Sequence, residues 1–233
     1  MFLWTGIMGA SAQEDHCDVN GDGVVNIADV TYVIDHILGK GHASTPTVVT
    51  GEAIDLGLPS GTKWASCNVG ATKPEEYGGY YAWGETEEKE VYDWSTYIHC
   101  DGSEETCHDL GSDISGTEYD VAHVKWGGDW VMPNSDDFEE LLDNCTSEWT
   151  TLNGVNGLKF TSNINGNSIF LPAASYRWED DLLFDGVFGY SWSSTQDPSN
   201  PSYTFRLSFY SDDPGFSSFR RVYGQSVRPV VRN

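Results

Sequence analysis

The sequence predicts an α+β domain that follows a small loop–helix module. From about Gly51 onward, short segments alternate apolar and polar residues between Gly, Pro and Asn turns, which is typical of antiparallel strands. One stretch, 130–145, has helical spacing instead. Before both, an Asp/Asn/Gly-rich loop at 18–29 leads into an apolar helical stripe. We therefore expect twisted antiparallel strands, one main helix and long loops after residue 50.

Composition limits the partners of the chain. Its 233 residues include 12 Lys and Arg against 36 Asp and Glu, which gives a net charge of −24. Such a charge repels DNA, RNA and anionic lipid, so we expect no nucleic-acid partner. We interpret the excess of acidic residues as a feature that keeps the protein soluble. The length of the chain suits one domain plus a small module.

The first residues resemble the end of a signal peptide. Residues 1–12, MFLWTGIMGASA, form an apolar run that ends in the small-x-small pattern Ala10-Ser11-Ala12, although no basic residues precede it. The run is shorter than the ~20 residues that span a bilayer. We expect a signal-peptide remnant, no membrane span, and a secreted or cell-surface protein.

Residues 18–29, DVNGDGVVNIAD, have the spacing of a calcium loop. Such a loop needs oxygen ligands at positions 1, 3, 5, 7, 9 and 12 and a glycine at position 6, which here is Gly23. The predicted ligands are Asp18, Asn20, Asp22, the Val24 carbonyl, Asn26 and Asp29. The sequence predicts calcium as the cofactor, and the alternative is a turn of the same composition without an ion.

An apolar stripe follows the loop. Its residues are Ile27, Val30, Val33, Ile34, Ile37 and Leu38. Gly39 lies where a C-terminal cap belongs. Loop and helix together resemble a single dockerin repeat, EF-hand-like but with Asp at position 12, and the resemblance implies a cohesin-like partner. Dockerins carry two repeats, so the stripe packs either on the neighbouring domain or on a partner. We place this module at 13–41, a linker at 42–50 and the main domain at 51–233.

The five cysteines lie at positions 17, 67, 100, 107 and 145. Cys100 and Cys107 bracket a short polar loop, and export would favour a disulfide between them. With His99 and His108 beside them, they alternatively form a zinc site. Cys67 and Cys145 are either a second pair or buried free thiols, and Cys17 is left over.

The stretch 130–145, WVMPNSDDFEELLDNC, predicts a strand end, a corner and an amphipathic helix. Asn134 is the expected N-cap and Asp137 its capping-box partner. The expected apolar face consists of Phe138, Leu141, Leu142 and Cys145. This corner resembles that of formylglycine-generating-enzyme-like domains, which have the C-type lectin fold.

The remaining pattern predicts strands around a long loop. Strands are expected at 53–57, 62–71, 158–162, 168–171, 190–195, 202–210 and 222–231. Asn165-Gly166 predicts a hairpin turn between 158–162 and 168–171. Residues 86–129 are polar and are expected to form the long loop.

Six segments together resemble one family. They are LGLPSGTKWASCNVGA, GGYYAWGET, WVMPNSDDFEELLDNC, NGNSIFLPAASYR, GYSWSST and GQSVRPV. In this order they resemble the FISUMP (Fibrobacter succinogenes major paralogous) domains of secreted Bacteroidota-type proteins, over about residues 54–230. The resemblance implies a C-type-lectin-like α+β fold, export and no established enzymatic activity. The sequence departs from the family at Ser175, where Gly is usual.

The expected function is binding or adhesion, with a glycan or a surface protein as the ligand. Exposed aromatic rings beside Asp and Arg suit such surfaces. The candidates, on two expected loops, are Tyr176, Arg177 and Trp178, and Tyr210, Asp212, Asp213, Phe216 and Arg220. For Trp178 a place in the core is an equal alternative. We expect a monomer.

Two alternatives compete with a binding role. An oxidase like the formylglycine-generating enzymes needs two reactive cysteines near the end of its domain, and no cysteine follows Cys145. A polysaccharide-active enzyme needs a carboxylate pair, which 36 acidic residues make uninformative. A receptor diversified by retroelements on the same fold is the second alternative. We expect that the chain is not an enzyme.

Overall fold

The computed structural model describes residues 51–211 and 213–232, together with Val30 and Val33. The chain consists of two compact units, and the boundary in the sequence lies between Thr47 and Val48. In the first unit, Val30 and Val33 are helical and exposed. The expected signal-peptide remnant, calcium loop and linker lie outside the described residues.

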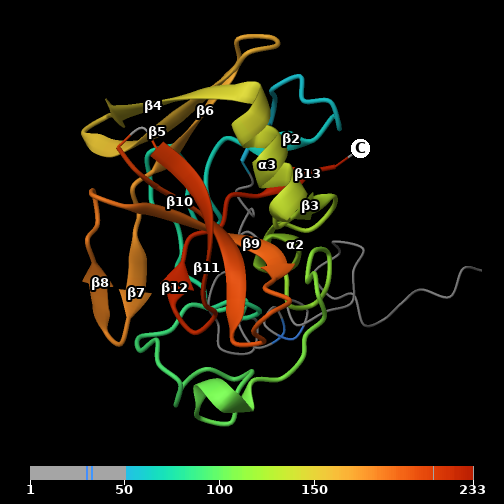
Figure 1. Ribbon diagram of the computed structural model, residues 1–233, viewed down its shortest axis with the longest axis vertical. Helices are drawn as coiled ribbons and strands as arrows, with labels where there is room; N and C mark the ends of the chain where they lie inside the picture. The colour runs from blue at the N-terminus through green and yellow to red at the C-terminus, as the bar shows by residue number, and fades with distance from the viewer. Residues whose placement is uncertain (1–29, 31–32, 34–50, 212, 233) are drawn as a thin grey trace, which may run out of the picture. The chain divides into compact units, whose positions relative to one another are not determined.

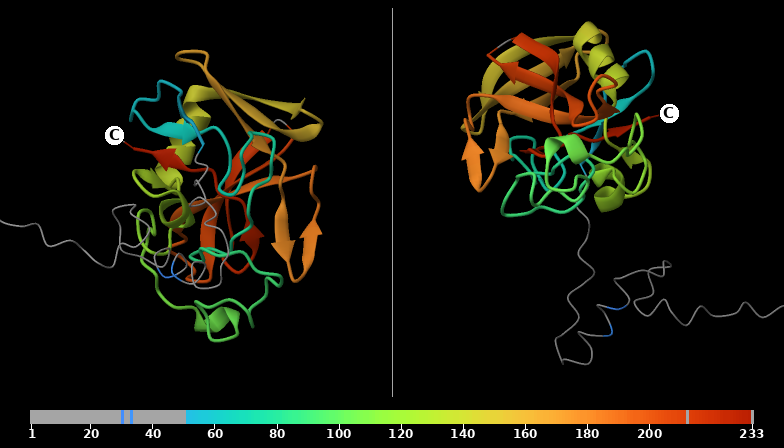
Figure 2. Two further views of the ribbon diagram at one scale, coloured as in Figure 1. Left: turned by 180° about the vertical axis from the view of Figure 1, so that it is seen from behind. Right: turned by 60° about the horizontal axis from the view of Figure 1, so that its bottom comes forward.

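A four-stranded sheet brings the two ends of the second unit together (Figure 2). Its strands, in spatial order, are β1 (Ala53–Asp55), β2 (Lys63–Ala65), β13 (Val230–Val231) and β3 (Trp130–Val131). All three pairings are antiparallel, and Trp64 lies opposite Ile54 on one side and Val230 on the other. The last strand therefore pairs with β2 and β3 and joins the end of the unit to its beginning, although only 224–225 and 230–231 of the expected strand 222–231 are extended.

A second sheet contains the predicted hairpin. Its strands are β4 (Cys145–Leu152), β5 (Val155–Ser162) and β6 (Ser168–Pro172). β5 and β6 pair antiparallel around Asn165-Gly166, with Leu158 opposite Leu171, which confirms the hairpin. β4 was not predicted, because its sequence CTSEWTTL is mostly polar.

Two further sheets form the C-terminal half of the fold (Figure 1). One contains β9 (Gly189–Gln196), β10 (Tyr203–Tyr210) and β11 (Asp213–Arg220), with β10 in the middle. The other contains β12 (Gly224–Gln225), β7 (Tyr176–Trp178) and β8 (Asp181–Leu183). On β10, Leu207 and Phe209 are buried in the core, so Arg206, Ser208 and Tyr210 lie on the opposite face.

The main helix confirms the expected cap. α3 (Ser135–Asn144) begins after Asn134, whose side chain accepts from the Asp137 amide at 2.9 Å. The Asp137 carboxylate accepts from the Asn134 amide at 2.9 Å, which completes the capping box. Phe138 and Leu141 are fully buried in the core that α3 shares with β9 and β10.

The helix ends earlier than expected. Cys145 has extended backbone and begins β4, so it caps the helix instead of continuing its apolar face. A second helix, α2 (Val121–Trp126), and a 3-10 turn, η1 (Glu104–Thr106), lie within the segment expected to be a long loop. The described helices include none long and apolar enough to cross a membrane.

The expected α+β, C-type-lectin-like fold is wrong. Between residues 51 and 232 the described chain forms four small antiparallel sheets, and its α-helices are two, of six and ten residues. The fold is therefore β-rich. Residues 176–178 and 213–220, expected to be ligand loops, are strands β7 and β11, because pairing with neighbouring strands outweighs a loop-like composition.

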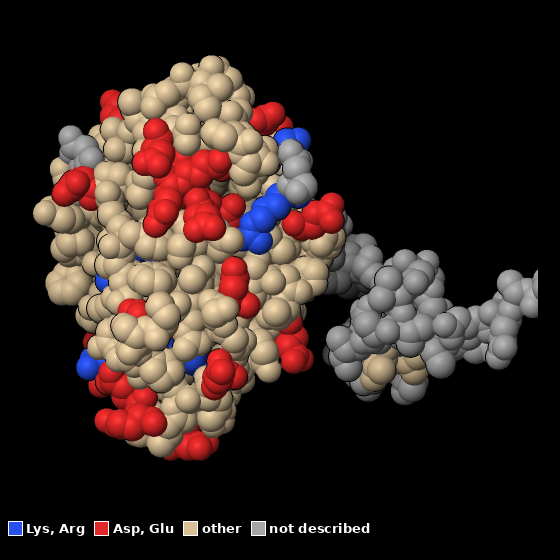
Figure 3. Space-filling model, turned by 45° about the vertical axis from the view of Figure 1, so that its right-hand side comes forward, with Lys and Arg blue, Asp and Glu red and all other residues tan. Residues whose placement is uncertain are grey.

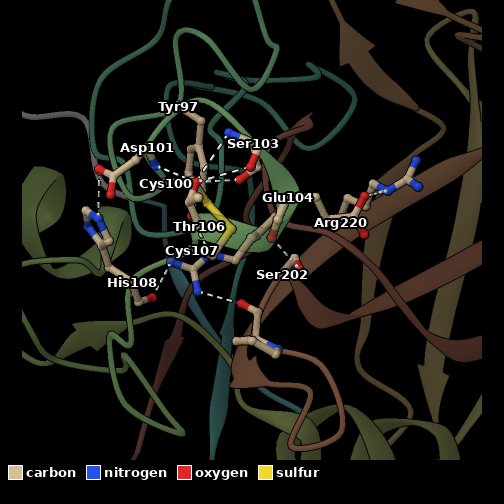
Figure 4. Close-up of a disulfide and its surroundings, with 12 residues drawn as sticks. Tyr97, Cys100, Asp101, Ser103, Glu104, Thr106, Cys107, His108, Ser202 and Arg220 are labelled. Atoms are coloured by element: carbon tan, nitrogen blue, oxygen red, sulfur yellow. Dashed lines mark hydrogen bonds and ion pairs between the residues drawn. A yellow bond between two sulfur atoms is a disulfide. The ribbon is translucent and has the colours of Figure 1, made fainter.

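Cys100 and Cys107 form the expected disulfide, with Cα atoms 4.0 Å apart (Figure 4). His99 Nε2 lies 2.9 Å from the Gly84 carbonyl oxygen and His108 Nε2 lies 3.2 Å from an Asp101 oxygen. Because the two sulfur atoms are bonded to each other, the cysteines are not thiolate ligands, so the zinc alternative is wrong.

Of the two alternatives for Cys67 and Cys145, the buried free thiols are confirmed and the second pair is wrong. Cys67 and Cys145 are free, buried thiols, and Cys17 lies outside the described residues. Burial raises the pKa of both thiols, that of Cys145 to about 11. Both therefore stay protonated and inert at neutral pH.

Candidate functional site

Aromatic rings form a continuous chain of contacts on the face of β9–β10–β11 opposite Leu207 and Phe209. At one end of this chain, Phe219 and Tyr223 pack against a second core cluster, which contains Trp192. The rings of Tyr176 and Tyr190 are 5.7 Å apart, and those of Phe188 and Tyr210 are 5.8 Å apart, centroid to centroid. We define the aromatic face by Tyr176, Trp178, Phe188, Tyr190, Arg206, Tyr210, Phe219 and Tyr223. This surface joins residues from β7, β9, β10 and β11.

Arg206 occupies the middle of this face. Its guanidinium carbon lies 3.8 Å from the ring centroid of Tyr190 and 3.7 Å from that of Phe219, so two rings enclose it. The side chain is 6% exposed. Nε donates to the Ser217 hydroxyl at 3.4 Å, but Nη1 is buried and has no hydrogen-bond partner.

The charge of Arg206 is incompletely compensated. Burial lowers the pKa of its guanidinium to about 10, and the nearby Tyr190 opposes that shift. The group still carries its proton at neutral pH. Among the described residues, the carboxylates that form ion pairs do so with other cations. A buried cation with a free donor is a costly arrangement that a bound anion would relieve.

A cavity of about 360 Å³ is lined in part by Arg206. Its walls are Phe188, Tyr190, Arg206, Ser208, Phe209, Tyr210, Asp213, Pro214 and Gly215. Gly215 lies opposite Ser208 in the sheet, and a Cβ atom there would meet no atom within 4 Å. The missing side chain at this position thus leaves the space open.

Four of the predicted ligand-binding residues lie on or beside the aromatic face. Tyr176 and Trp178 are half-buried in its ring contacts, and Tyr210 is 57% exposed. Asp213 lines the cavity. The structure thus brings together residues from both predicted ligand segments.

The other predicted residues lie elsewhere. Arg177 stacks over the ring of Tyr80 at 5.3 Å, and Arg220 Nε is 3.0 Å from a Glu104 oxygen. Phe216 packs 5.7 Å from Phe138, centroid to centroid, and so belongs to the core side of β11. Asp212 and the six predicted calcium ligands between residues 18 and 29 lie outside the described residues.

Sequence reasoning missed Arg206, Phe188 and Tyr190. Arg206 stands in YTFRLSFY, where alternation places it on the face opposite Leu207 and Phe209. An arginine at such a position is usually solvated, and only the folded chain shows that two rings cover it. The signal that was present is the dense aromatic alternation of β9 and β10.

A second hollow, of about 400 Å³, lies beside β1, β4, β5 and β6. It is lined by Ile54, Leu152, Phe170, Lys159 and their neighbours. None of its described lining residues carries a buried polar atom without a partner. The Arg206 cavity is therefore the stronger candidate.

Comparison with known proteins gives one match. Residues 16–56 match the family model described as Dockerin type I domain. No curated protein and no solved structure matches the chain significantly. The match extends into the second unit, which begins at Val48. Its last residues form β1, and Leu56 is fully buried in the core of that unit.

Proposed function

We propose that this chain is a secreted or cell-surface, non-catalytic protein with two binding activities. Residues 16–56 dock, in a calcium-dependent way, on a cohesin-type protein. The aromatic face of the second unit binds a glycan or a surface protein. The chain would thereby attach a ligand-binding domain to an extracellular assembly.

The docking activity is supported by the family match together with the spacing of the calcium loop. Three carboxylates, two amides and one carbonyl occupy its six ligand positions. Val30 and Val33 of the apolar stripe are helical and 51% and 38% exposed. An exposed apolar stripe suits a protein partner.

The ligand-binding activity rests on Arg206. A buried guanidinium with a free donor, beside a cavity walled by aromatic rings, combines the usual features of a recognition site.

Capture on immobilised cohesins tests the docking activity. The full chain should bind in calcium and be released by EGTA, because the ion holds the loop that presents the helix. The double variant Asp18→Ala, Asp22→Ala should not bind, whereas Asp129→Ala, which removes an exposed acid outside the loop, should bind normally. Capture that survives EGTA, or that needs no loop carboxylate, contradicts calcium-dependent docking.

A glycan and surface-protein array tests the second activity. Binding should fall when Tyr210 or Gly215 is replaced, and the bound ligand should remain chemically unchanged. A parallel screen for product release from polysaccharides addresses the competing enzyme. Turnover that depends on acidic residues at the aromatic face would replace this proposal.

A further inference from the structure

We propose that the Arg206 cavity receives the single carboxylate of a uronic acid unit carried by an otherwise neutral glycan. This inference rests on the proposed binding role of the aromatic face and names the chemistry of its ligand. Four observations lead to it: the Arg206 donor that has no partner, the complete hydrogen bonding of the other buried arginines, the residues that line the cavity and the net charge of the chain.

The free donor of Arg206 points to an anion. Its guanidinium is a planar fork that matches the two oxygens of a carboxylate. Ser217 accepts a long bond from Nε and the Tyr190 hydroxyl is a further hydrogen-bond partner of the side chain, while the buried Nη1 donates to no atom. Arg206 lines the cavity, and among the described residues no carboxylate forms an ion pair with it, so a carboxylate bound there would compensate the buried charge.

Two other buried arginines show how this protein satisfies such groups when they are structural. Arg221 donates from Nε, Nη1 and Nη2 to Tyr97 Oη, Pro201 O and His108 O. Arg228 donates likewise to Asn68 Oδ1, Ala65 O and Phe170 O. Arg206 is buried almost as deeply, lacks such a set of acceptors, and is the one of the three that lines a described cavity.

The walls of the cavity suit a sugar. A volume of about 360 Å³ lies within the ~300–1,000 Å³ of small-molecule sites. Phe188, Tyr190 and Tyr210 offer flat apolar rings against which the C–H face of a pyranose packs. Ser208 and Asp213 add polar atoms that can bond sugar hydroxyls.

The charge of the chain favours one carboxylate over many. With 36 acidic and 12 basic side chains, the protein repels a polyanion. Acidic side chains clearly outnumber basic ones on the face drawn in Figure 3. Asp213 also lines the cavity itself. An acidic peptide or a polyuronate would meet this repulsion at every residue, whereas one uronate on a neutral chain meets it once.

Calorimetry with the full chain tests the inference, with calcium held constant. Methyl β-glucuronoside is the probe, and methyl β-glucoside and the methyl ester of the uronoside are its neutral counterparts. The acid should bind at least tenfold more tightly than either neutral sugar. Equal binding of the acid and its ester, or tighter binding of a tetraglutamate peptide, would overturn the inference.

Three variants locate the site. Gly215→Val fills the cavity without touching Arg206, and because the new side chain enters open space the fold should keep its unfolding temperature while binding is lost. Arg206→Lys keeps the positive charge but removes the planar guanidinium that can donate to both carboxylate oxygens, so binding should weaken at least tenfold. Arg220→Lys, the matched control, makes the same substitution on the neighbouring strand, where the side chain pairs with Glu104, and binding should change less than twofold. Uronoside binding that survives Gly215→Val would also overturn the inference.

The outcomes separate this inference from the proposed function. If the chain binds a neutral glycan or a protein and loses it in Gly215→Val, the binding role stands and the carboxylate inference fails. If no arrayed ligand is affected by Gly215→Val, both fail.

Discussion

At the scale of single residues, Ser175 is a strained position that glycine should improve. Its φ is 53°, its side chain is fully buried, and its hydroxyl has no partner. The left-handed conformation costs an L-residue about 1–2 kcal/mol, and glycine loses about 0.5–1 kcal/mol in chain entropy. With the orphaned hydroxyl also removed, Ser175→Gly should stabilise the protein by about 1 kcal/mol. Urea unfolding measures this, and a lower midpoint would show that Ser175 makes a contact of net benefit.

The buried arginines should differ in their contribution to stability. Arg228→Met leaves three acceptors without a donor, so the free energy of unfolding should fall by at least about 3 kcal/mol. Arg206→Met removes a long bond to Ser217, a hydrogen bond with Tyr190 and a buried charge that has no carboxylate partner, while a Met side chain can still pack between the two rings. Stability should therefore change by less than about 1 kcal/mol. Denaturant unfolding of both variants makes the comparison. Similar large losses would mean that Arg206 is retained for the fold, not for a ligand.

At the scale of elements, the cap of α3 gives a direct measure of local stabilisation. Asn134→Ala removes the acceptor for the Asp137 amide and should cost about 1 kcal/mol. Asp137→Ala should cost more, because that carboxylate also lies 2.7 Å from Arg232 Nη2 and accepts from Thr62. Urea unfolding of the two variants decides the order. An unchanged midpoint for Asn134→Ala would show that packing alone holds the helix.

Elements with strong local signals could be predicted from the sequence. The capping box at Asn134 and the hairpin around Asn165-Gly166 each depend on a few adjacent residues, and both are present. β11 could not be predicted, because DPGFSSFR contains Pro, Gly and small residues and is a strand only through its eight-residue pairing with β10. The predicted ligand-binding segments were expected to be loops because their strand pairing, likewise, is not visible in the local sequence. Arg206 was missed because the rings that cover it come from two other strands.

Three buried tyrosines lie in the segment between β2 and α2. Because their hydroxyls are protonated in the folded protein, we expect the protein to lose stability at high pH. Tyr80, Tyr92 and Tyr97 each donate to a backbone carbonyl at 2.6 Å. Burial raises the pKa of all three hydroxyls, that of Tyr92 to about 12. Since an unfolded tyrosine ionises near pH 10, their contribution is complete below about pH 10 and is lost as the pH rises toward 12.

The urea midpoint measured between pH 8 and 11.5 tests this. It should fall above pH 10, and Tyr92→Phe should fall less steeply than wild type. Tyr210→Phe, which changes an exposed hydroxyl, should follow the wild type. A midpoint independent of pH up to 11.5 would contradict the role of these hydroxyls.

At the scale of the whole molecule, the fold of the second unit depends on both of its ends. β13 lies between β2 and β3, so the sheet that holds Trp64 is complete only when residues near 64 and near 230 meet. Such long-range pairing leaves no local trace in the sequence, which is one reason why the strands were predicted better than their arrangement. The dockerin match, which extends to residue 56, therefore overlaps a segment that this sheet requires.

That overlap predicts where the chain can be cut. A chain of residues 48–233 retains β1 and every described core cluster, so it should be monomeric and unfold at the same urea midpoint as the full chain. A chain of residues 57–233 lacks β1 and the buried Leu56, and it should be markedly less stable or insoluble. Calcium should bind once to the full chain, with a Kd on the order of ~0.1–1 mM, and not to the 48–233 chain. Light scattering, urea unfolding and calorimetry of the three chains test these expectations together. A loss of stability in the 48–233 chain would mean that the two units are not independent. Calcium binding by that chain would mean that the loop at 18–29 is not the calcium site.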